Sequence, residues 1–209
     1  MELKINFGRE FEFKRVKNTL QMLGWFLDNG YKPYLPEKID KQSSDKEIKT
    51  QIIKEYNIRK YENVGKRLAR DFNDKQNQFT EILEEVFSTK VPSLVEIYLT
   101  QYGVGGSYDI PNIVVFNINN KKEVKTIFHE IVHIFLEPNI LKYGINHNEK
   151  ERIVDLILNS QPFSFLHYNY WQGSYNGVEI YLDQLFEKYF FRGRGRFFNK
   201  IKESRISSV

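Results

Sequence analysis

Two of the chain's four histidines lie four residues apart in the segment KTIFHEIVHIFLEP, residues 125–138, and a glutamate follows the first of them directly. Residues four apart share one face of an α-helix, so His129 and His133 can direct both imidazoles at one point. Neutral imidazoles are ligands that Zn²⁺ favours, and Glu130 can face a water on the metal without binding the metal itself. The spacing predicts a zinc-binding helix that carries its own general base.

Most other residues near this motif are apolar, which favours a functional role for His129, Glu130 and His133. Buried polar groups cost free energy unless they are paired. The alternative is a half-exposed helix with two structural histidines and a solvated glutamate, because five-residue motifs also arise by chance. The apolar positions are Ile127, Ile131, Val132, Ile134 and Phe135.

A zinc site needs a further ligand, and composition narrows the search. The chain has no cysteine, which excludes thiolate sites and disulfides and leaves His, Asp and Glu. The segment NEKERIVDLIL places Glu151 and Asp155 four residues apart, on one face of a second predicted helix. Seventeen residues separate His133 from Glu151, enough for a turn and a returning helix. Other acids and imidazoles near in sequence are Glu137, His147, which we expect in the connecting loop, and Glu149, which should point away from the face of Glu151.

Together, HEIVH and ERIVD resemble the gluzincin group of zinc metallopeptidases, the thermolysin-like and aminopeptidase-like enzymes, over about residues 103–160. The resemblance implies that His129, His133 and Glu151 bind Zn²⁺, that Glu130 is the general base, and that Asp155 orients a histidine ligand. It also implies a peptide or protein substrate. The related pattern with a third histidine does not fit, because Leu136 and Asn139 stand where it requires Gly and His.

The resemblance extends upstream to GVGGSYDIPNIVVFNI, which resembles the edge strand that pairs with substrate backbone in these families. Gly105 and Gly106 would permit close approach of the backbone there. The segment lacks the glutamate that binds a free substrate amine in aminopeptidases and has Tyr108 and Asp109 instead, so aminopeptidase specificity is not supported. The alternative is that the two glycines only form a hairpin turn.

These families take a Tyr or His downstream of the third ligand to stabilise the oxyanion of peptide hydrolysis. The segment FSFLHYNYWQGSY offers several such residues. We favour His167 and Tyr168 for this role over Tyr170 and Tyr175.

The predicted fold is α+β and zincin-like, with a small mixed sheet packed on the motif helix and a helical lobe. We expect one domain over residues 1–209: a mainly helical part (1–91), the sheet with the zinc-binding helices (92–160), and a helical part with a basic tail (161–209). Periodicity predicts one or two strands within 2–13, further strands within 94–103 and 112–119, and helices at about 17–29, 46–56, 57–87, 120–138, 148–160 and 178–191. For the motif helix, Asn120 and Glu123 suggest a capping box and Pro138 suggests the end.

The net charge of +4 is mild, and the chain lacks a secretory signal or a run of apolar residues that could span a bilayer. We therefore expect a soluble, cytoplasmic protein that does not contact membranes; its oligomeric state is not indicated. Residues 188–209 carry seven cationic residues against one acid, for a net charge of +6. Such a run most often forms a solvated, partly disordered end. An alternative function is an inactive zincin-fold binding or regulatory module, associated with nucleic acid through this tail.

Overall fold

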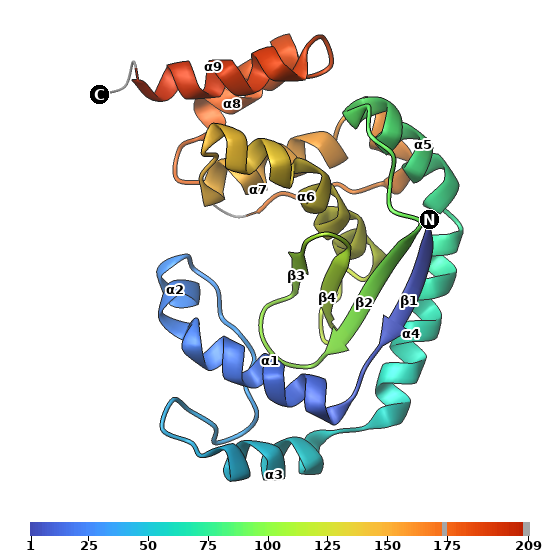
Figure 1. Cartoon of the computed structure of the whole chain (residues 1–209), viewed down its shortest axis with the longest axis vertical. Coiled ribbons are helices and arrows are strands. Elements are labelled where there is room, and N and C mark those ends of the chain that lie inside the picture. Colours follow the sequence, from blue (N-terminus) through green and yellow to red (C-terminus); the bar gives the residue numbers. More distant parts are fainter. Residues whose placement is uncertain (173–174, 207–209) are drawn as a thin grey trace. The chain divides into compact units, whose positions relative to one another are not determined.

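The computed structural model describes residues 1–172 and 175–206 and belongs to the α+β class, with a four-stranded mixed sheet and many helices (Figure 1). The predicted class and the small mixed sheet are thereby confirmed. The chain divides into two compact units. The first comprises Met1–Gln76 and Pro92–Glu130, and the second comprises Asn77–Val91 and Ile131–Val209.

The first unit contains the sheet. Its elements are β1 (Glu2–Asn6), α1 (Arg9–Gln21), α2 (Leu23–Asp28), α3 (Asp45–Glu55), α4 (Ile58–Asn73), β2 (Leu94–Thr100), β3 (Gly106–Asp109), β4 (Ile113–Asn117) and the start of α6 (Val124–Tyr143). Strands β2 and β4 lie where β-branched and aromatic residues predicted them. Of the one or two strands predicted within residues 2–13, one forms, namely β1, and α1 already begins at Arg9.

The sheet has the order β1-β2-β4-β3, in which β1, β2 and β4 are parallel and β3 is antiparallel to β4. Strand β3 therefore forms one edge. Alternate residues of β2 are fully buried, and Ile97 lies opposite Val114 of β4. Helix α4 packs on this sheet at Gly65, where an added Cβ would lie 3.3 Å from Ile5 Cγ2 and 3.5 Å from Leu99 Cδ1.

A buried glutamate joins three elements of the first unit. Glu12 of α1 is fully buried and accepts hydrogen bonds from the Tyr61 hydroxyl of α4, from the Thr100 hydroxyl of β2, and from the backbone N–H of Gln101 at 2.9 Å. Burial raises the pKa of Glu12, and these three hydrogen bonds only partly offset that effect. The carboxyl group therefore fixes α1 against the sheet, and ionising it in the folded protein is unfavourable.

The second unit is helical. Its elements are α5 (Gln76–Phe87, apart from its first residue), the rest of α6, α7 (His147–Leu158), the 3-10 helix η1 (Gln161–Leu166), α8 (Glu179–Leu185), the π-helical turn η2 (Phe186–Phe190) and α9 (Arg194–Ile206). Aromatic rings form much of its core, as in the pairs Phe79 with Phe163 and Phe87 with Phe135. Arg152 of α7 donates to both carboxylate oxygens of Asp183 and so ties α7 to α8.

The basic tail differs from its prediction. Residues 194–206 form helix α9, in which Phe197, Phe198 and Ile201 are fully buried, so this part of the tail belongs to the folded second unit. Its Arg205 forms an ion pair with Glu149 at the start of α7. This helix forms because its apolar residues are spaced three and four apart and can be buried on one face. The prediction considered only the net charge of the segment and so overlooked this spacing.

The predicted limits of the motif helix are wrong at both ends. Glu123 has a left-handed backbone (φ 46°) and precedes α6, so it does not complete a capping box with Asn120. Pro138 lies inside α6, so one missing amide hydrogen bond does not end the helix, which continues and buries Ile140. The helix ends at Gly144 (φ 59°), where the backbone N–H of Ile145 bonds the carbonyl of Ile140.

Within the described residues, no helix combines the length and the apolar character that crossing a bilayer requires.

We expect Glu12→Gln to change how stability depends on pH. A carboxyl group whose pKa is higher in the folded chain stabilises fully below its unfolded pKa of about 4.5, and that contribution is lost as pH rises through the folded pKa. The free energy of unfolding of the wild type, measured with urea from about pH 4 to about pH 8, should therefore fall relative to that of Glu12→Gln.

Glu47→Gln is the control for this measurement. Hydrogen bonds from Ser44 lower the pKa of the exposed Glu47, so the wild type should gain stability relative to that variant as pH rises. If the free energies of unfolding of the wild type and of Glu12→Gln changed in parallel with pH, the raised pKa of Glu12 in the folded chain would be contradicted.

Candidate metal centre

Helix α6 brings the two motif histidines together. His129 and His133 lie one turn apart on a continuous helix, and the division between the two units falls inside it, after Glu130. Their exposed fractions are 7% and 1%, and that of Glu130 is 6%. Three groups that water would hydrate strongly are thus buried on one helix, and each needs a polar partner.

Glu151 of α7 completes a cluster with them. Its Oε2 lies 3.3 Å from Nε2 of His133, and one ligand atom from each of His129, His133 and Glu151 lies within 4.8 Å of the other two. All three residues are buried. Two imidazoles and one carboxylate at these distances could share one metal ion.

The start of α7 is fixed by a cap that involves Glu149. Asn146 accepts from the backbone N–H of Glu149 at 3.0 Å, and the Glu149 carboxylate accepts from the backbone N–H of Asn146 at 2.8 Å. Glu149 also accepts from the Tyr181 hydroxyl and from the guanidinium of Arg205. This fully buried acid therefore holds α7 in place, two residues before Glu151.

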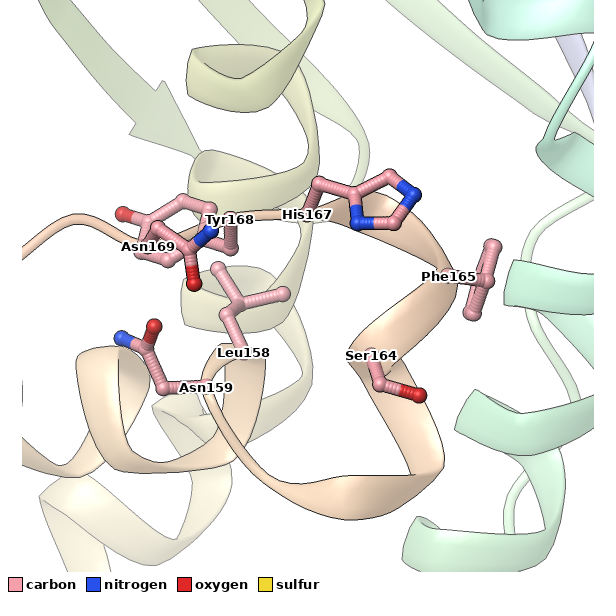
Figure 2. Close-up of a pocket in the computed structure, with 7 residues that line it drawn as sticks. All are labelled: Leu158, Asn159, Ser164, Phe165, His167, Tyr168 and Asn169. Atoms are coloured by element: carbon pink, nitrogen blue, oxygen red, sulfur yellow. The ribbon is translucent and has the colours of Figure 1, made fainter.

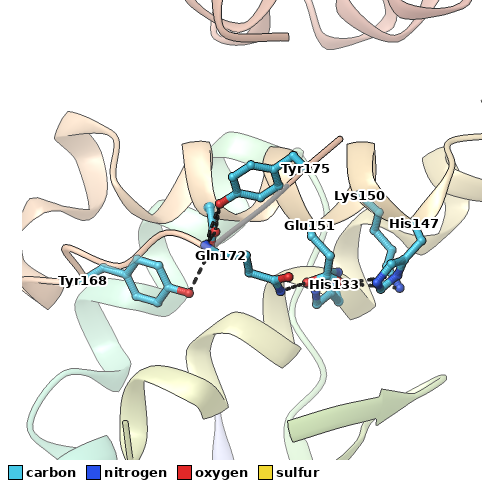
Figure 3. A network of polar contacts seen from close by, with 8 residues as sticks. His133, His147, Lys150, Glu151, Tyr168, Gln172 and Tyr175 are labelled. Carbon is cyan, nitrogen blue, oxygen red and sulfur yellow. Dashed lines mark hydrogen bonds and ion pairs between the residues drawn. The ribbon is translucent and has the colours of Figure 1, made fainter. Parts of the chain in front are cut away.

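His147 is the first residue of α7, whereas the sequence suggested a loop position. Its Nδ1 lies 3.7 Å from Oε1 of Glu151, and Nζ of Lys150 lies 3.7 Å from the same oxygen (Figure 3). Burial lowers the pKa of His147, which favours its neutral form. Of the other residues near in sequence, neither Glu137 nor Glu149 joins His129, His133 and Glu151 in the ligand cluster that the described part of the chain forms.

Gln172 forms a hydrogen bond with the Oε2 atom of Glu151. Its Nε2 donates to Oε2 of Glu151 at 2.6 Å, and its backbone N–H donates to Oδ2 of Asp155 at 2.9 Å (Figure 3). Gln172 lies in the loop that follows η1 and begins at His167, which we call the aromatic loop. One residue of this loop thus contacts both Glu151 and Asp155. Sequence reasoning missed Gln172, because a single amide in a loop carries no periodic signal.

Asp155 anchors the aromatic loop on α7. It is fully buried and accepts from the Tyr168 hydroxyl at 3.1 Å, from the Tyr175 hydroxyl and from the backbone of Gln172. Burial, together with the hydrogen bond to Asp155, raises the pKa of Tyr175. The predicted role of Asp155 in orienting a histidine stays a prediction, and these contacts add a role in positioning the loop.

The two predicted oxyanion donors lie in that loop. The Tyr168 hydroxyl donates to Asp155, and His167 has a left-handed backbone (φ 47°). Both line a cavity of about 430 Å³ (Figure 2), whose walls include none of the three candidate ligands. The oxyanion role of His167 and Tyr168 stays a prediction. The other lining residues are Leu158, Asn159, Ser164, Phe165 and Asn169.

Gly105 and Gly106 lie at the start of edge strand β3 and approach the first unit's part of α6 closely. A Cβ on Gly106 would lie 2.4 Å from Oε1 of Glu130 and 2.5 Å from Cγ2 of Thr126. Asn120 donates to the Gly105 carbonyl at 3.2 Å, and a Cβ on Gly105 would lie 2.9 Å from the donating nitrogen. Close packing therefore disfavours a side chain at Gly106, whereas the end of the Asn120 side chain could shift to admit one at Gly105, and the edge strand passes directly beside Glu130.

A buried cation of the first unit lies in the field of Glu130. Burial lowers the pKa of Arg15, while the charges of Glu130 and Glu12 raise it. The guanidinium packs against Gly103 (φ 77°), where a Cβ would lie 2.5 Å from its Nε. Arg15 thereby supplies positive charge close to the predicted general base.

The chain matches no family model, no curated protein and no solved structure. The likeness to gluzincins therefore rests on the residues and geometry described above. Those residues place a buried His-His-Glu cluster, able to hold a metal ion, beside a fourth buried group, Glu130.

We expect Gln172→Ala to weaken metal binding, because the amide holds the Glu151 carboxylate in place. Loss of such a hydrogen bond to a metal ligand reduces affinity about 10- to 100-fold. Competition with a zinc-binding dye measures the change. Gln161→Ala, an exposed residue of the same unit, should leave affinity unaltered. Equal metal affinities for Gln172→Ala and the wild type would show that Gln172 does not support metal binding.

Proposed function

We propose that the chain is a zinc-dependent peptidase in which His129, His133 and Glu151 bind the metal. The observation that carries the proposal is the buried cluster of two imidazoles and one carboxylate, with their ligand atoms within 4.8 Å. The absence of cysteine and the nitrogen and oxygen donor set favour zinc in a catalytic site over a closed structural site. Three protein ligands leave one position open for a water molecule or a substrate.

Bound zinc would act as a Lewis acid, polarising a substrate carbonyl and lowering the pKa of a water molecule. Glu130 follows His129 directly on α6, one step round the helix, and does not join the ligand cluster, so its carboxylate could face a water on the metal without binding the metal itself. It would accept the proton of the attacking water and deliver that proton to the leaving amine. The charges of Glu130 and Arg15 interact, so Arg15 supplies a positive charge near the proposed general base.

The edge strand supports a peptide as the substrate. The outer edge of β3 presents backbone groups to which an extended peptide can add as a further strand. Because Gly106 lies against Glu130, a peptide paired there would pass beside the general base. This geometry favours cleavage within an extended chain, as an endopeptidase or a protease with a narrow target would perform.

Metal analysis of the wild type and two variants tests the proposal. We expect about one zinc per chain in the wild type, loss of zinc in Glu151→Ala, and retention of zinc without cleavage in Glu130→Gln. Glu137→Gln, on the same helix but outside the cluster, is the matched control and should keep both zinc and cleavage.

The measurements are elemental analysis of the purified chain and mass spectrometry of a peptide library. A wild type without zinc, or Glu151→Ala with full zinc, would overturn the ligand assignment. Zinc without cleavage of any peptide would refute the peptidase and leave the metal site standing.

We expect Gly106→Ala to lower the cleavage rate about 100-fold while zinc is retained, because the new methyl group displaces the Glu130 carboxylate. Gly24→Ala is the control, since it lies in α2 with no atom within 4 Å of an added Cβ. Steady-state cleavage of a library-derived peptide and the zinc content measure the two effects. Equal rates for Gly106→Ala and the wild type would contradict the close approach of β3 to Glu130.

A further inference from the structure

The cationic residues of the C-terminal segment divide into paired and unpaired groups. Arg205 binds the buried Glu149, and Lys200 forms an ion pair with Glu203. Arg194 donates to the Ser88 hydroxyl at 2.9 Å and lies over the ring of Phe87. These three residues have contacts that explain their presence in a folded helix.

Three other cations converge on one pocket of the second unit. Lys188, Arg192 and Arg196 line a cavity of about 210 Å³ together with Tyr189 and Gly193. We call these five residues the basic pocket. No Asp or Glu lines it, and no ion pair involving its three cations occurs in the described part of the chain. The basic pocket thus collects positive charge that no ion pair among the described residues neutralises.

Local packing holds the cations together despite their mutual repulsion. Lys188 Nζ lies 5.3 Å and Arg196 Cζ lies 4.9 Å from the centre of the Tyr189 ring, which attracts both. The carbonyl of Tyr189 accepts from the backbone N–H groups of Arg192 at 3.1 Å and Gly193 at 2.9 Å. The turn before α9 therefore fixes the backbone position from which Arg192 extends.

The chemistry of these side chains favours a phosphoryl group. Two guanidinium groups and one ammonium group offer many donors and three positive charges, which match the several oxygens and the high charge of a phosphate better than a carboxylate. A water molecule occupies about 30 Å³ of liquid, so the cavity has room for a phosphoryl group with several waters.

We propose that the basic pocket binds a phosphoryl group, carried either by a small phosphate compound or by the backbone of a nucleic-acid strand. The pocket shares no residue with the metal cluster, so this proposal stands independently of the peptidase. The basic C-terminal segment then serves as a binding site for phosphate.

Binding measurements on the full chain test the proposal. The probes are inorganic phosphate and ATP by calorimetry, and a fluorescent single-stranded oligonucleotide by anisotropy, at low and at moderate salt. The test variant is Lys188→Gln with Arg192→Gln and Arg196→Gln. The control combines Lys32→Gln, Lys41→Gln and Lys54→Gln, which removes the same charge from exposed positions of the first unit.

We expect saturable binding that weakens at least about 10-fold in the pocket variant and less than about 2-fold in the control, as for loss of charge-assisted hydrogen bonds. Binding of phosphate or ATP assigns the pocket to small phosphate compounds, and binding of the oligonucleotide alone assigns it to a strand.

Absence of saturable binding for every probe, or equal weakening in both triple variants, would overturn the proposal. Arg192→Gln, a single change at an exposed side chain, repeats the comparison if the triple variant is unfolded. In that variant, unchanged affinity for a probe that the wild type binds would also overturn it.

Discussion

Helix α6 imposes the constraint on which the rest of the site depends. It must be apolar enough to be buried, yet it carries His129, Glu130 and His133 at exposed fractions of 7% or less. Burying imidazoles and carboxylates without partners costs several kcal/mol per charged group, on the order of the whole stability of a domain. The surrounding chain therefore has to supply matching charges and donors, and much of the fold near α6 can be understood as doing so.

Helix α7 supplies three acidic residues near this site, and each makes different contacts. Glu149 caps the helix and binds Arg205, Glu151 faces the imidazole of His133, and Asp155 receives the aromatic loop. The loop in turn returns Gln172 to Glu151. The position of the third candidate ligand is thus determined by residues that lie up to 54 positions later in the sequence.

The sequence predicted best what depends on local spacing. His129 and His133 were found because a separation of four residues places side chains on one helical face, and Glu151 was found through the resemblance of HEIVH and ERIVD to the gluzincins. The structure brings these three residues together. Strands β2 and β4 followed from their β-branched residues. The roles of Arg15 and Gln172 could not be predicted, because each depends on a contact between distant segments with no repeating pattern.

Errors arose where a strong local signal was overridden by tertiary packing. Pro138 should end a helix, yet α6 continues to Tyr143 and buries Ile140 beyond the proline. Charge suggested a solvated tail, yet Phe197 and Phe198 fold residues 194–206 into a helix. In both places the apolar residues near the signal, and not the signal itself, decided the structure.

The ion pair between Arg205 and Glu149 makes helix α9 part of the structure that supports the candidate metal site. A protease that removed residues from Gly193 onward would leave a fully buried carboxylate without its cation, at the cap of the helix that carries Glu151. Limited proteolysis near Gly193, far in sequence from His129 and His133, would therefore make the position of Glu151 less fixed. A single cut in the last turn before α9 would thus weaken the candidate metal site irreversibly.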